Sequence, residues 1–398
     1  MGDHDDPPSR SELADRLEKL EENVYPDRRQ VLMAGGAIGA LGIFGRDLAG
    51  GSGDEPSMEA STSTIQTSSP APYPVVVSKG RSGKIHAESP GGQIDCGTDA
   101  TSVIESAIAA LPAGGGTVLI QNGTYTLPSP ITITKSGVVV RGQSWNTELR
   151  AASGLDGDMV RVGDGGSTKV TGVVFRDLCL AGNSDVETGI HFTSQVWYCR
   201  VRNSSIMDVR GDGIRLTSTD GFCVWHVIEG CKIENAGRDG VNLVGRKTRD
   251  NFINNCAIRS NGRIGVNAGD PGQNWNHFYQ IGFLGNGEAG IAIGGRYTNV
   301  EGCHFEFNQQ GGIRMTSCQH SAVVGNTFRE NSRGSPGDHP EILANGSYST
   351  VVANSGYAPE SLSAIAKIRG DKDVMAANTF EGAGYTDDSA NSIQELNI

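Results

Sequence analysis

Aromatic residues, positive charge and paired cysteines are all scarce in this sequence of 398 residues. Phe, Trp and Tyr make up only 6% of it, and the formal net charge is −12. Such an acidic chain lacks the broad positive field that attracts nucleic acid, so no nucleic-acid partner is expected, and an acidic sugar would need a local basic site. None of the eight cysteines forms a Cys-x-x-Cys pair, which argues against a zinc site.

Long apolar segments are also missing. The most apolar one follows Arg28 and Arg29 and runs for about 15 residues, too short and too Gly-rich for a comfortable membrane span. No stable membrane span is therefore expected. Two arginines before an apolar segment resemble a twin-arginine export signal, here residues 28–48, and this resemblance implies a secreted, extracellular protein. A short membrane anchor is the alternative.

The segments on either side of this signal are polar. Residues 1–27 are acidic and place Leu13, Leu17, Leu20 and Val24 at the 4-3-4 spacing of a short amphipathic helix. We interpret them as an extended leading region of the signal. A small oligomerising coil is the alternative, so both a monomer and a trimer stay open. Residues 49–90 are interpreted as a linker, because their first part is rich in Gly, Ser, Thr and Pro.

Glycine is abundant, with 56 residues, but without the Gly-X-Y period of collagen. From residue 170 the sequence repeats with a period of about 25 residues. One column of equivalent positions contains Leu178, Ser204, Cys231, Cys256, Ile281, Cys303, Asn326, Asn354 and Asn378. Two positions later the residues are mostly apolar: Leu180, Ile206, Ile233, Ile258, Phe283, Phe305, Phe328, Gly356 and Phe380. A further column pairs Gly with an aliphatic residue: Ile190, Ile214, Val241, Val266, Ile291 and Ile313.

Short β-branched runs with this period predict a parallel solenoid with one coil per repeat. Helical repeats would show a 3.6-residue periodicity, and propeller blades need about 40–45 residues. Similar residues then stack on one another, so Asn326, Asn354 and Asn378 are expected to form a hydrogen-bonded ladder. Cys231 and Cys256 share that column and are interpreted as packing residues, with a disulfide between them as the alternative.

The start of the repeat region has its own pattern. Residues 99–111 show the amphipathic spacing of a helix whose apolar face would close the open end of a solenoid. Gly-Gly-Gly-Thr-Val-Leu-Ile follows at 114–120 and Asn-Gly-Thr-Tyr at 122–125. Together these segments resemble the opening of the pectate-lyase-like β-helix superfamily. The resemblance implies an all-β, right-handed, single-stranded parallel β-helix of about 10 coils over residues 91–390, with an N-terminal capping helix. That superfamily includes polysaccharide lyases, glycoside hydrolases, uronate epimerases and phage tailspikes.

Residues directly after each Gly–aliphatic pair are expected to point outward in a line along the solenoid, which we call the stripe. It comprises His191, Arg215, Asn242, Asn267, Ala292 and Arg314. Asp212 and Asp239 precede two of the pairs, on successive coils. We interpret His191, Asp212, Arg215 and Asp239 as catalytic. The substrate-binding candidates are Asn242, Asn267, Arg314 and the loop residue Trp275.

A uronate lyase needs a cation or amide to neutralise the sugar carboxylate, a base for the C5 proton, and an acid for the departing oxygen. The stripe contains these residue types, so a polysaccharide lyase that cleaves an acidic polysaccharide by β-elimination is favoured. A glycoside hydrolase with Asp212 and Asp239 as paired carboxylates is one alternative. A non-catalytic glycan-binding tailspike or adhesin is another. The same two aspartates are candidates for a Ca²⁺ site or for turn caps. Known catalytic motifs of polygalacturonases and alginate epimerases are absent.

Overall fold

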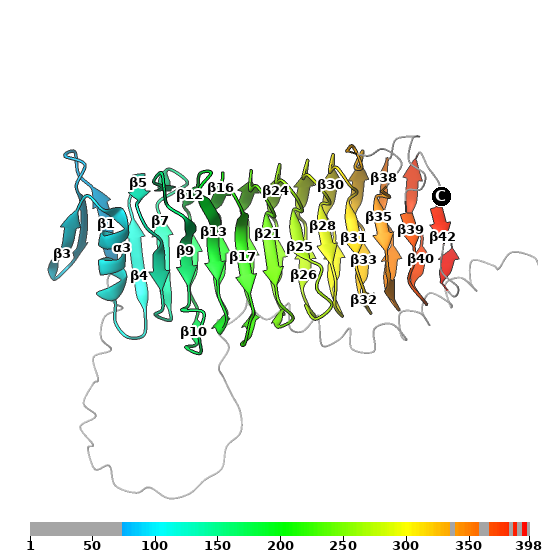
Figure 1. The fold of residues 1–398 in the computed structure, drawn as a ribbon, viewed down its shortest axis with the longest axis horizontal. Coiled ribbons are helices and arrows are strands. Elements are labelled where there is room, and N and C mark those ends of the chain that lie inside the picture. The colour runs from blue at the N-terminus through cyan, green and yellow to red at the C-terminus, as the bar shows by residue number, and fades with distance from the viewer. Residues whose placement is uncertain (1–73, 335–338, 358–365, 382–384, 388–391, 396–398) are drawn as a thin grey trace, which may run out of the picture. The chain divides into compact units, whose positions relative to one another are not determined.

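The computed structural model describes residues 74–334, 339–357, 366–381, 385–387 and 392–395. The expected export signal and the leucine heptads lie outside these residues. Three long sheets run side by side along an elongated parallel β-helix (Figure 1). Each repeat forms one coil, as predicted, and most coils contribute one short strand to each of the three sheets. No helix in the described part of the chain is long and apolar enough to cross a membrane.

The first sheet begins with an antiparallel meander that precedes the solenoid: β1 (Val75–Lys79), β2 (Ile85–Ser89) and β3 (Gly92–Gly97). Because β1 also pairs in parallel with β4 (Gly116–Ile120), it extends the first sheet. The prediction of a linker up to residue 90 is therefore wrong from Val75 onward. Buried and more exposed residues alternate in these strands, with Val75, Val77, Ile85 and Ala87 buried, and this alternation is typical of strands and not of a linker.

The remaining strands follow the coil order. The first sheet continues through β7 (Val138–Gly142), β11 (Val174–Arg176), β15 (Arg200–Arg202), β19 (Val227–Glu229), β23 (Phe252–Asn254), β26 (His277–Tyr279), β29 (Asn299–Glu301), β33 (Ala322–Val324), β37 (Thr350–Val352), β40 (Val374–Ala376) and β43 (Ile393–Glu395). The second sheet contains β5 (Gly123–Leu127), β8 (Thr147–Ala151), β12 (Cys179–Ala181), β16 (Ser205–Met207), β20 (Lys232–Glu234), β24 (Ala257–Arg259), β27 (Gly282–Leu284), β30 (His304–Glu306), β34 (Thr327–Arg329), β38 (Ser355–Tyr357) and β41 (Thr379–Glu381).

The third sheet is the one that carries the stripe. It contains β6 (Ile131–Ile133), β9 (Gly157–Val162), β13 (Val186–Phe192), β17 (Asp212–Thr217), β21 (Val241–Val244), β25 (Val266–Ala268), β28 (Ile291–Ile293), β31 (Ile313–Met315), β35 (Ile342–Ala344), β39 (Ala366–Ile368) and β42 (Tyr385–Asp387). A small corner sheet contains β10 (Val170–Thr171), β14 (Val196–Trp197), β18 (Cys223–Val224) and β22 (Thr248–Arg249), and β32 (Cys318–Gln319) pairs with β36 (Gly346–Ser347).

The capping helix is present as α3 (Ala100–Ala109). Asp99 is its N-cap and accepts a hydrogen bond from the Ser102 backbone N–H at 3.1 Å. Its buried face includes Val103, Ile104 and Ala107. The prediction of a capped solenoid is therefore confirmed, because the apolar face of this helix shields the first coil from water.

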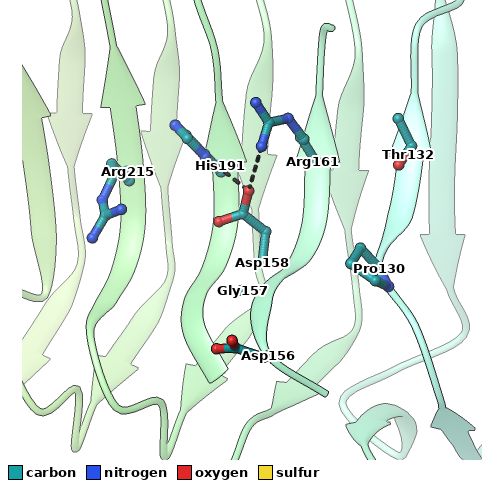
Figure 2. Close-up of a pocket in the computed structure, with 8 residues that line it drawn as sticks. All are labelled: Pro130, Thr132, Asp156, Gly157, Asp158, Arg161, His191 and Arg215. Carbon is teal, nitrogen blue, oxygen red and sulfur yellow. Dashed lines mark hydrogen bonds and ion pairs between the residues drawn. The ribbon is translucent and has the colours of Figure 1, made fainter. Parts of the chain in front are cut away.

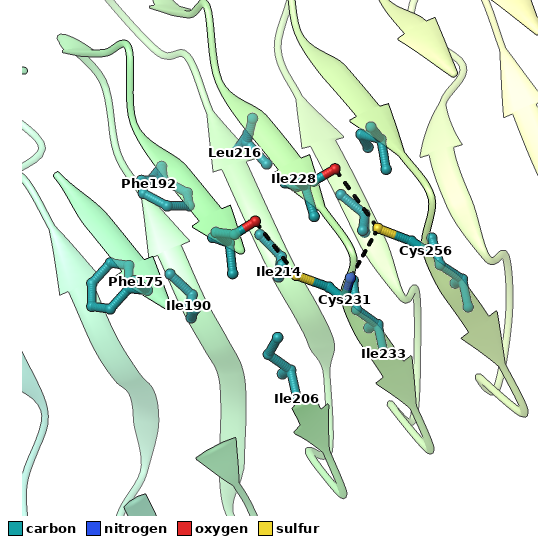
Figure 3. Packing of buried hydrophobic residues seen from close by; sticks show 14 of the residues in the cluster. Phe175, Ile190, Phe192, Ile206, Ile214, Leu216, Ile228, Cys231, Ile233 and Cys256 are labelled. Atoms are coloured by element: carbon teal, nitrogen blue, oxygen red, sulfur yellow. Dashed lines mark hydrogen bonds between the residues drawn. The ribbon is translucent and has the colours of Figure 1, made fainter. Parts of the chain in front are cut away.

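The predicted columns stack in register. Ile206 pairs with Ile233 and Ile233 with Ile258, while the rings of Phe283 and Phe305 stack with centroids 4.8 Å apart. All eight cysteines are free thiols, so the disulfide alternative is wrong. Figure 3 shows Cys231 and Cys256 on neighbouring coils among apolar side chains, where the Cys231 N–H donates to the Cys256 sulfur at 3.4 Å. The packing interpretation is thereby confirmed.

Side-chain amides form ladders inside the solenoid. The Asn326 amide donates to the Asn354 carbonyl oxygen, and Asn354 in turn donates to Asn378, each at 2.9 Å, as predicted. A second ladder, which the repeat did not predict, contains Asn261, Asn286, Asn308 and Asn331. It ends on the carboxyl group of Glu341, which is fully buried and accepts the Asn331 amide at 2.6 Å. Each amide satisfies backbone groups of a neighbouring coil, so loss of one would leave buried polar atoms unpaired.

Candidate functional site

A cavity of about 380 Å³ opens on the outer face of the third sheet, near the capped end. Its lining comes from four successive strands, β6, β9, β13 and β17, and from the residues just before β6 and β9: Pro130, Thr132, Asp156, Gly157, Asp158, Arg161, His191 and Arg215 (Figure 2). Register places Arg161, His191 and Arg215 at equivalent positions of β9, β13 and β17. Two cations therefore lie on the coils directly before and after the imidazole, about 4.8 Å away along the axis.

His191 is held at both ring nitrogens. Nδ1 lies 2.9 Å from Asp158 Oδ2, and Nε2 lies 2.9 Å from the Thr217 hydroxyl. Because the carboxylate accepts, Nδ1 carries the proton of the neutral ring, and the lone pair of Nε2 accepts from Thr217. Carboxylate, imidazole and hydroxyl follow one another as in nucleophilic triads, where the carboxylate fixes the imidazole tautomer. The arrangement provides an oriented base.

The two arginines beside His191 differ in how accessible they are to a ligand. Burial raises the pKa of Asp158, but the hydrogen bond and charge of His191, with the charge of Arg161, outweigh it and lower the pKa below its usual value. Arg161 contacts Asp158 at 3.4 Å and its side chain is 41% exposed. Arg215 is 18% exposed and donates to Asp212 at 2.7 Å and Glu187 at 3.0 Å. Arg161 is therefore the more available cation for an acidic ligand.

Asp212 and Asp239 lie on successive coils, as predicted, but both are fully buried. Asp212 accepts the Asp239 backbone N–H at 3.2 Å and the Asn242 amide at 2.8 Å. Asp239 repeats this pattern on the next coil, with the Ile264 N–H at 3.2 Å and the Asn267 amide at 3.1 Å. Burial and the charge of Asp212 raise the pKa of Asp239. These contacts correspond to the turn-capping alternative, and they place neither carboxylate in the cavity.

The same contacts bear on the expected Ca²⁺ site. Calcium requires a cluster of oxygen ligands with free lone pairs, whereas Asp212 already accepts from Arg215, Asn242 and a backbone N–H. Within the described ranges, no group of three or more His, Cys, Asp or Glu side chains is arranged to hold a metal ion. The Asp212–Asp239 pair does not fit Ca²⁺ in this arrangement.

The remaining predicted residues do not converge with His191. Asn242 and Asn267 occupy the stripe in the predicted register, but their amides are engaged by the buried aspartates. Arg314 lies five coils from His191, about 24 Å along the axis, and contacts Glu288 at 3.6 Å. Trp275 lies past β25, on the coil of Asn267 and around the corner from the stripe. The stripe is thus a continuous column, and the cavity occupies one end of it.

Sequence reasoning missed Asp158, Arg161 and Thr217. A signal for the first two exists, because Asp158-x-x-Arg161 has the spacing of Asp212-x-x-Arg215. The Gly–aliphatic pattern does not extend to this coil, because Met159 stands before Val160 where the later coils have Gly before the aliphatic residue. Thr217 carries no comparable signal, since its role depends on reaching the imidazole of the preceding coil.

The comparisons with known proteins agree with this architecture. Residues 188–358 match a family described as right handed beta helix region. The solenoid is therefore a right-handed parallel β-helix, as predicted. No curated protein matches the chain.

Several solved structures share the fold. The A-module of mannuronan C-5 epimerase AlgE4 from Azotobacter vinelandii is 19% identical, with a TM-score of 0.61 over 74% of this chain and 95% of that chain. DFA-IIIase from Arthrobacter chlorophenolicus A6, without its lid and in complex with GF2, is 14% identical, with a TM-score of 0.60 over 75% and 90% of the two chains. The Dettilon tailspike protein is 15% identical, with a TM-score of 0.54 over 72% and 65%. At these identities the likeness concerns the fold alone.

Proposed function

We propose that this protein is a carbohydrate-active enzyme that removes the C5 proton of a uronate residue and cleaves an acidic polysaccharide by β-elimination. One observation carries the proposal. His191 lies in an open cavity, is oriented by Asp158, and is flanked on adjoining coils by Arg161 and Arg215. This arrangement supplies a base and a carboxylate-binding cation within reach of one sugar unit.

The chemistry assigns one role to each side chain. Arg161 pairs with the sugar carboxylate and withdraws charge from C5, which makes its proton more acidic. Nε2 of His191 takes that proton, the C4–O4 bond breaks, and a C4–C5 double bond forms. The imidazolium then returns the proton to the departing oxygen, so that protons and electrons balance. Asp158 stays ionised throughout, consistent with its lowered pKa, and stabilises the transient positive charge of His191.

Hydrolysis fits the cavity less well. A glycosidase needs one carboxyl group with a raised pKa as the general acid, together with a second carboxylate at a defined distance. Asp158 has a lowered pKa, and Asp239, whose pKa is raised, is fully buried and does not line the cavity. Elimination is therefore favoured over hydrolysis.

C5 epimerisation is a second candidate, because it begins with the same loss of the C5 proton. The specific observation in its favour is the likeness to a mannuronan C-5 epimerase, with the highest TM-score among the structures compared above. In this alternative a proton returns to C5 from the opposite face and the glycosidic bond survives. The cavity residues would keep the same roles up to that step.

The test is incubation of the purified protein with pectate and with alginate, with and without Ca²⁺. Elimination yields an unsaturated product that absorbs in the ultraviolet, and this is the expected result on at least one uronate polymer. New reducing ends without that absorbance would indicate hydrolysis, and a changed sugar configuration without cleavage would indicate epimerisation. If none of these changes occurs on any uronate, the enzymatic proposal fails.

Non-catalytic glycan binding is then the remaining candidate. A stable trimer in light scattering would favour this function, and a monomer would count against it.

Secretion is part of our proposal as well. Its support is Arg28 and Arg29, followed by a short apolar segment. Membership of the pectate-lyase-like superfamily is likewise inferred, from the opening motif at residues 114–125.

A further inference from the structure

A column of aromatic side chains runs along the corner between the small corner sheet and the first sheet. We call it the corner column. In register along successive coils it contains Tyr198, Trp225, Asp250, Trp275, Tyr297, His320 and Tyr348. Trp225 and Trp275 are 44% and 46% exposed. These aromatics lie outside the hydrophobic core and away from the His191 cavity.

The backbone does not account for aromatic residues in this column. Every member has a positive φ, for example 62° at Trp225 and 59° at Trp275. Bulky side chains are disfavoured in this left-handed region, which Gly, Asn and Asp adopt more easily. The other left-handed columns contain mostly smaller residues, with Asp177, Asn203, Gly230 and Asn255 in one and Asp208, Asn235 and Ser260 in another, and Phe307 is the one aromatic residue at a positive φ in the latter. The aromatics are therefore present despite the backbone.

Ring stacking accounts for part of the column but is interrupted at one coil. Trp275 stacks on Tyr297 with centroids 4.3 Å apart, and Trp225 stacks on Tyr198 at 6.1 Å. Asp250 occupies the coil between the two tryptophans, so the backbone positions of Trp225 and Trp275 are two coil spacings apart, about 9.6 Å. Two flat rings that project from positions at this separation have room for one further ring between them, above the Asp250 side chain. Among the described residues, neither indole has a ring partner on the side of Asp250.

Positive charge gathers beside this interruption, although the whole chain is acidic. The Arg249 guanidinium lies 5.0 Å and the Lys247 ammonium 5.7 Å from the Phe222 ring centroid. Arg249 Nε is buried, makes no hydrogen bond in the described part of the chain, and approaches an Asp250 oxygen at 3.4 Å. This nitrogen is turned toward Asp250, while the Arg249 side chain as a whole is 40% exposed, so part of it is accessible to a ligand.

We propose that the gap at Asp250, between the rings of Trp225 and Trp275, is a second binding site for one unit of an acidic glycan. The apolar faces of a pyranose ring stack on the two indoles, Asp250 accepts a sugar hydroxyl, and Arg249 with Lys247 binds the sugar carboxylate. The site holds the polymer away from the His191 cavity and catalyses nothing. It rests on the proposed function only in naming the same class of ligand.

The test is calorimetric titration of a uronate trisaccharide into the His191→Ala protein, which binds without turnover. Two sites per chain are expected, one in the cavity and one at the corner. The double variant Trp225→Asn/Trp275→Asn in that background is expected to keep only one site. Because Asn tolerates the left-handed backbone, the melting temperature of the double variant should equal or exceed that of the His191→Ala protein. Tyr348→Asn is the matched control from the same column and should keep both sites.

Three results would overturn the corner site. In the first, the double variant still binds at two sites. In the second, the Tyr348→Asn control also loses one site. In the third, the His191→Ala protein binds at one site only, and Arg161→Gln removes it. If the double variant fails to fold, Arg249→Gln replaces it, with at least a tenfold loss of corner affinity expected and unchanged affinity contradicting the proposal. Absence of turnover on every uronate, with the corner binding intact, would overturn the proposed function alone.

Discussion

Replacement of His191 by Ala is expected to lower the turnover of a uronate polymer by about 10²–10⁴-fold, the range of a general base. The physical reason is that no other described group in the cavity combines an unprotonated nitrogen with a supporting carboxylate at 2.9 Å. Replacement of Thr217 by Val should cost less than about tenfold, because its hydroxyl only occupies Nε2 in the resting state. Initial rates of ultraviolet absorbance measure both effects.

The Thr217 variant also distinguishes elimination from nucleophilic catalysis. If Thr217 were a nucleophile activated by His191, its removal would abolish activity as completely as the loss of the imidazole. Thermal unfolding of both variants should match the parent protein, and this control separates a catalytic loss from a folding defect. Equal losses of activity in well-folded Thr217→Val and His191→Ala proteins would contradict the assigned roles.

Stability is expected to fall between pH 5 and pH 8 because of Glu341. Burial raises the pKa of this carboxyl group from 4.5 to about 7, although hydrogen bonds from Asn331 oppose the shift. The folded state therefore favours the neutral acid. Its contribution is complete below the unfolded pKa and is lost as the pH rises through about 7. A shift of this size corresponds to about 3 kcal/mol of unfolding free energy.

Replacement of Glu341 by Gln should remove most of this pH dependence. Glu341 accepts the Asn331 N–H at one carboxyl oxygen and the Asn331 side-chain amide at the other. A Gln has one acceptor oxygen, and it can accept both donors as the Asn286 oxygen does from Asn261. Differential scanning calorimetry should show the variant melting above the parent at pH 8 and close to it at pH 5. Glu301→Gln, an exposed glutamate on β29, is the control. Parallel pH profiles for parent and variant would contradict the account.

The fold could be predicted from the sequence because, in a solenoid, residues one repeat apart lie next to each other on neighbouring coils. Once Ile206, Ile233 and Ile258 were aligned by their period, their stacking required no further information. The Asn326 ladder followed for the same reason. The meander formed by β1 and β2 did not, since it precedes the repeat and is antiparallel, so no equivalent coil exists to align it with.

The site was only partly predictable, because its contacts depend on the conformations and hydrogen-bond partners of the side chains as well as on the register of the strands. The sequence placed His191 beside Arg215 on successive coils, and the register confirms that neighbourhood. The interpretation of Asp212 as catalytic is not supported, because this side chain caps the backbone of the next coil and is fully buried. Position in a column predicts the neighbours of a residue, but not whether its polar atoms are used by those neighbours or left for a ligand.

The central claim is that the cavity recognises the carboxylate of a sugar through Arg161. The most direct measurement compares the cavity affinity of the His191→Ala protein, with the corner site removed, for a uronate trisaccharide and for the same sugar reduced to alcohols. We predict at least tenfold tighter binding of the uronate, and loss of that preference in Arg161→Gln but not in the exposed second-sheet control Arg150→Gln. Equal affinity for the charged and the reduced sugar would contradict the account.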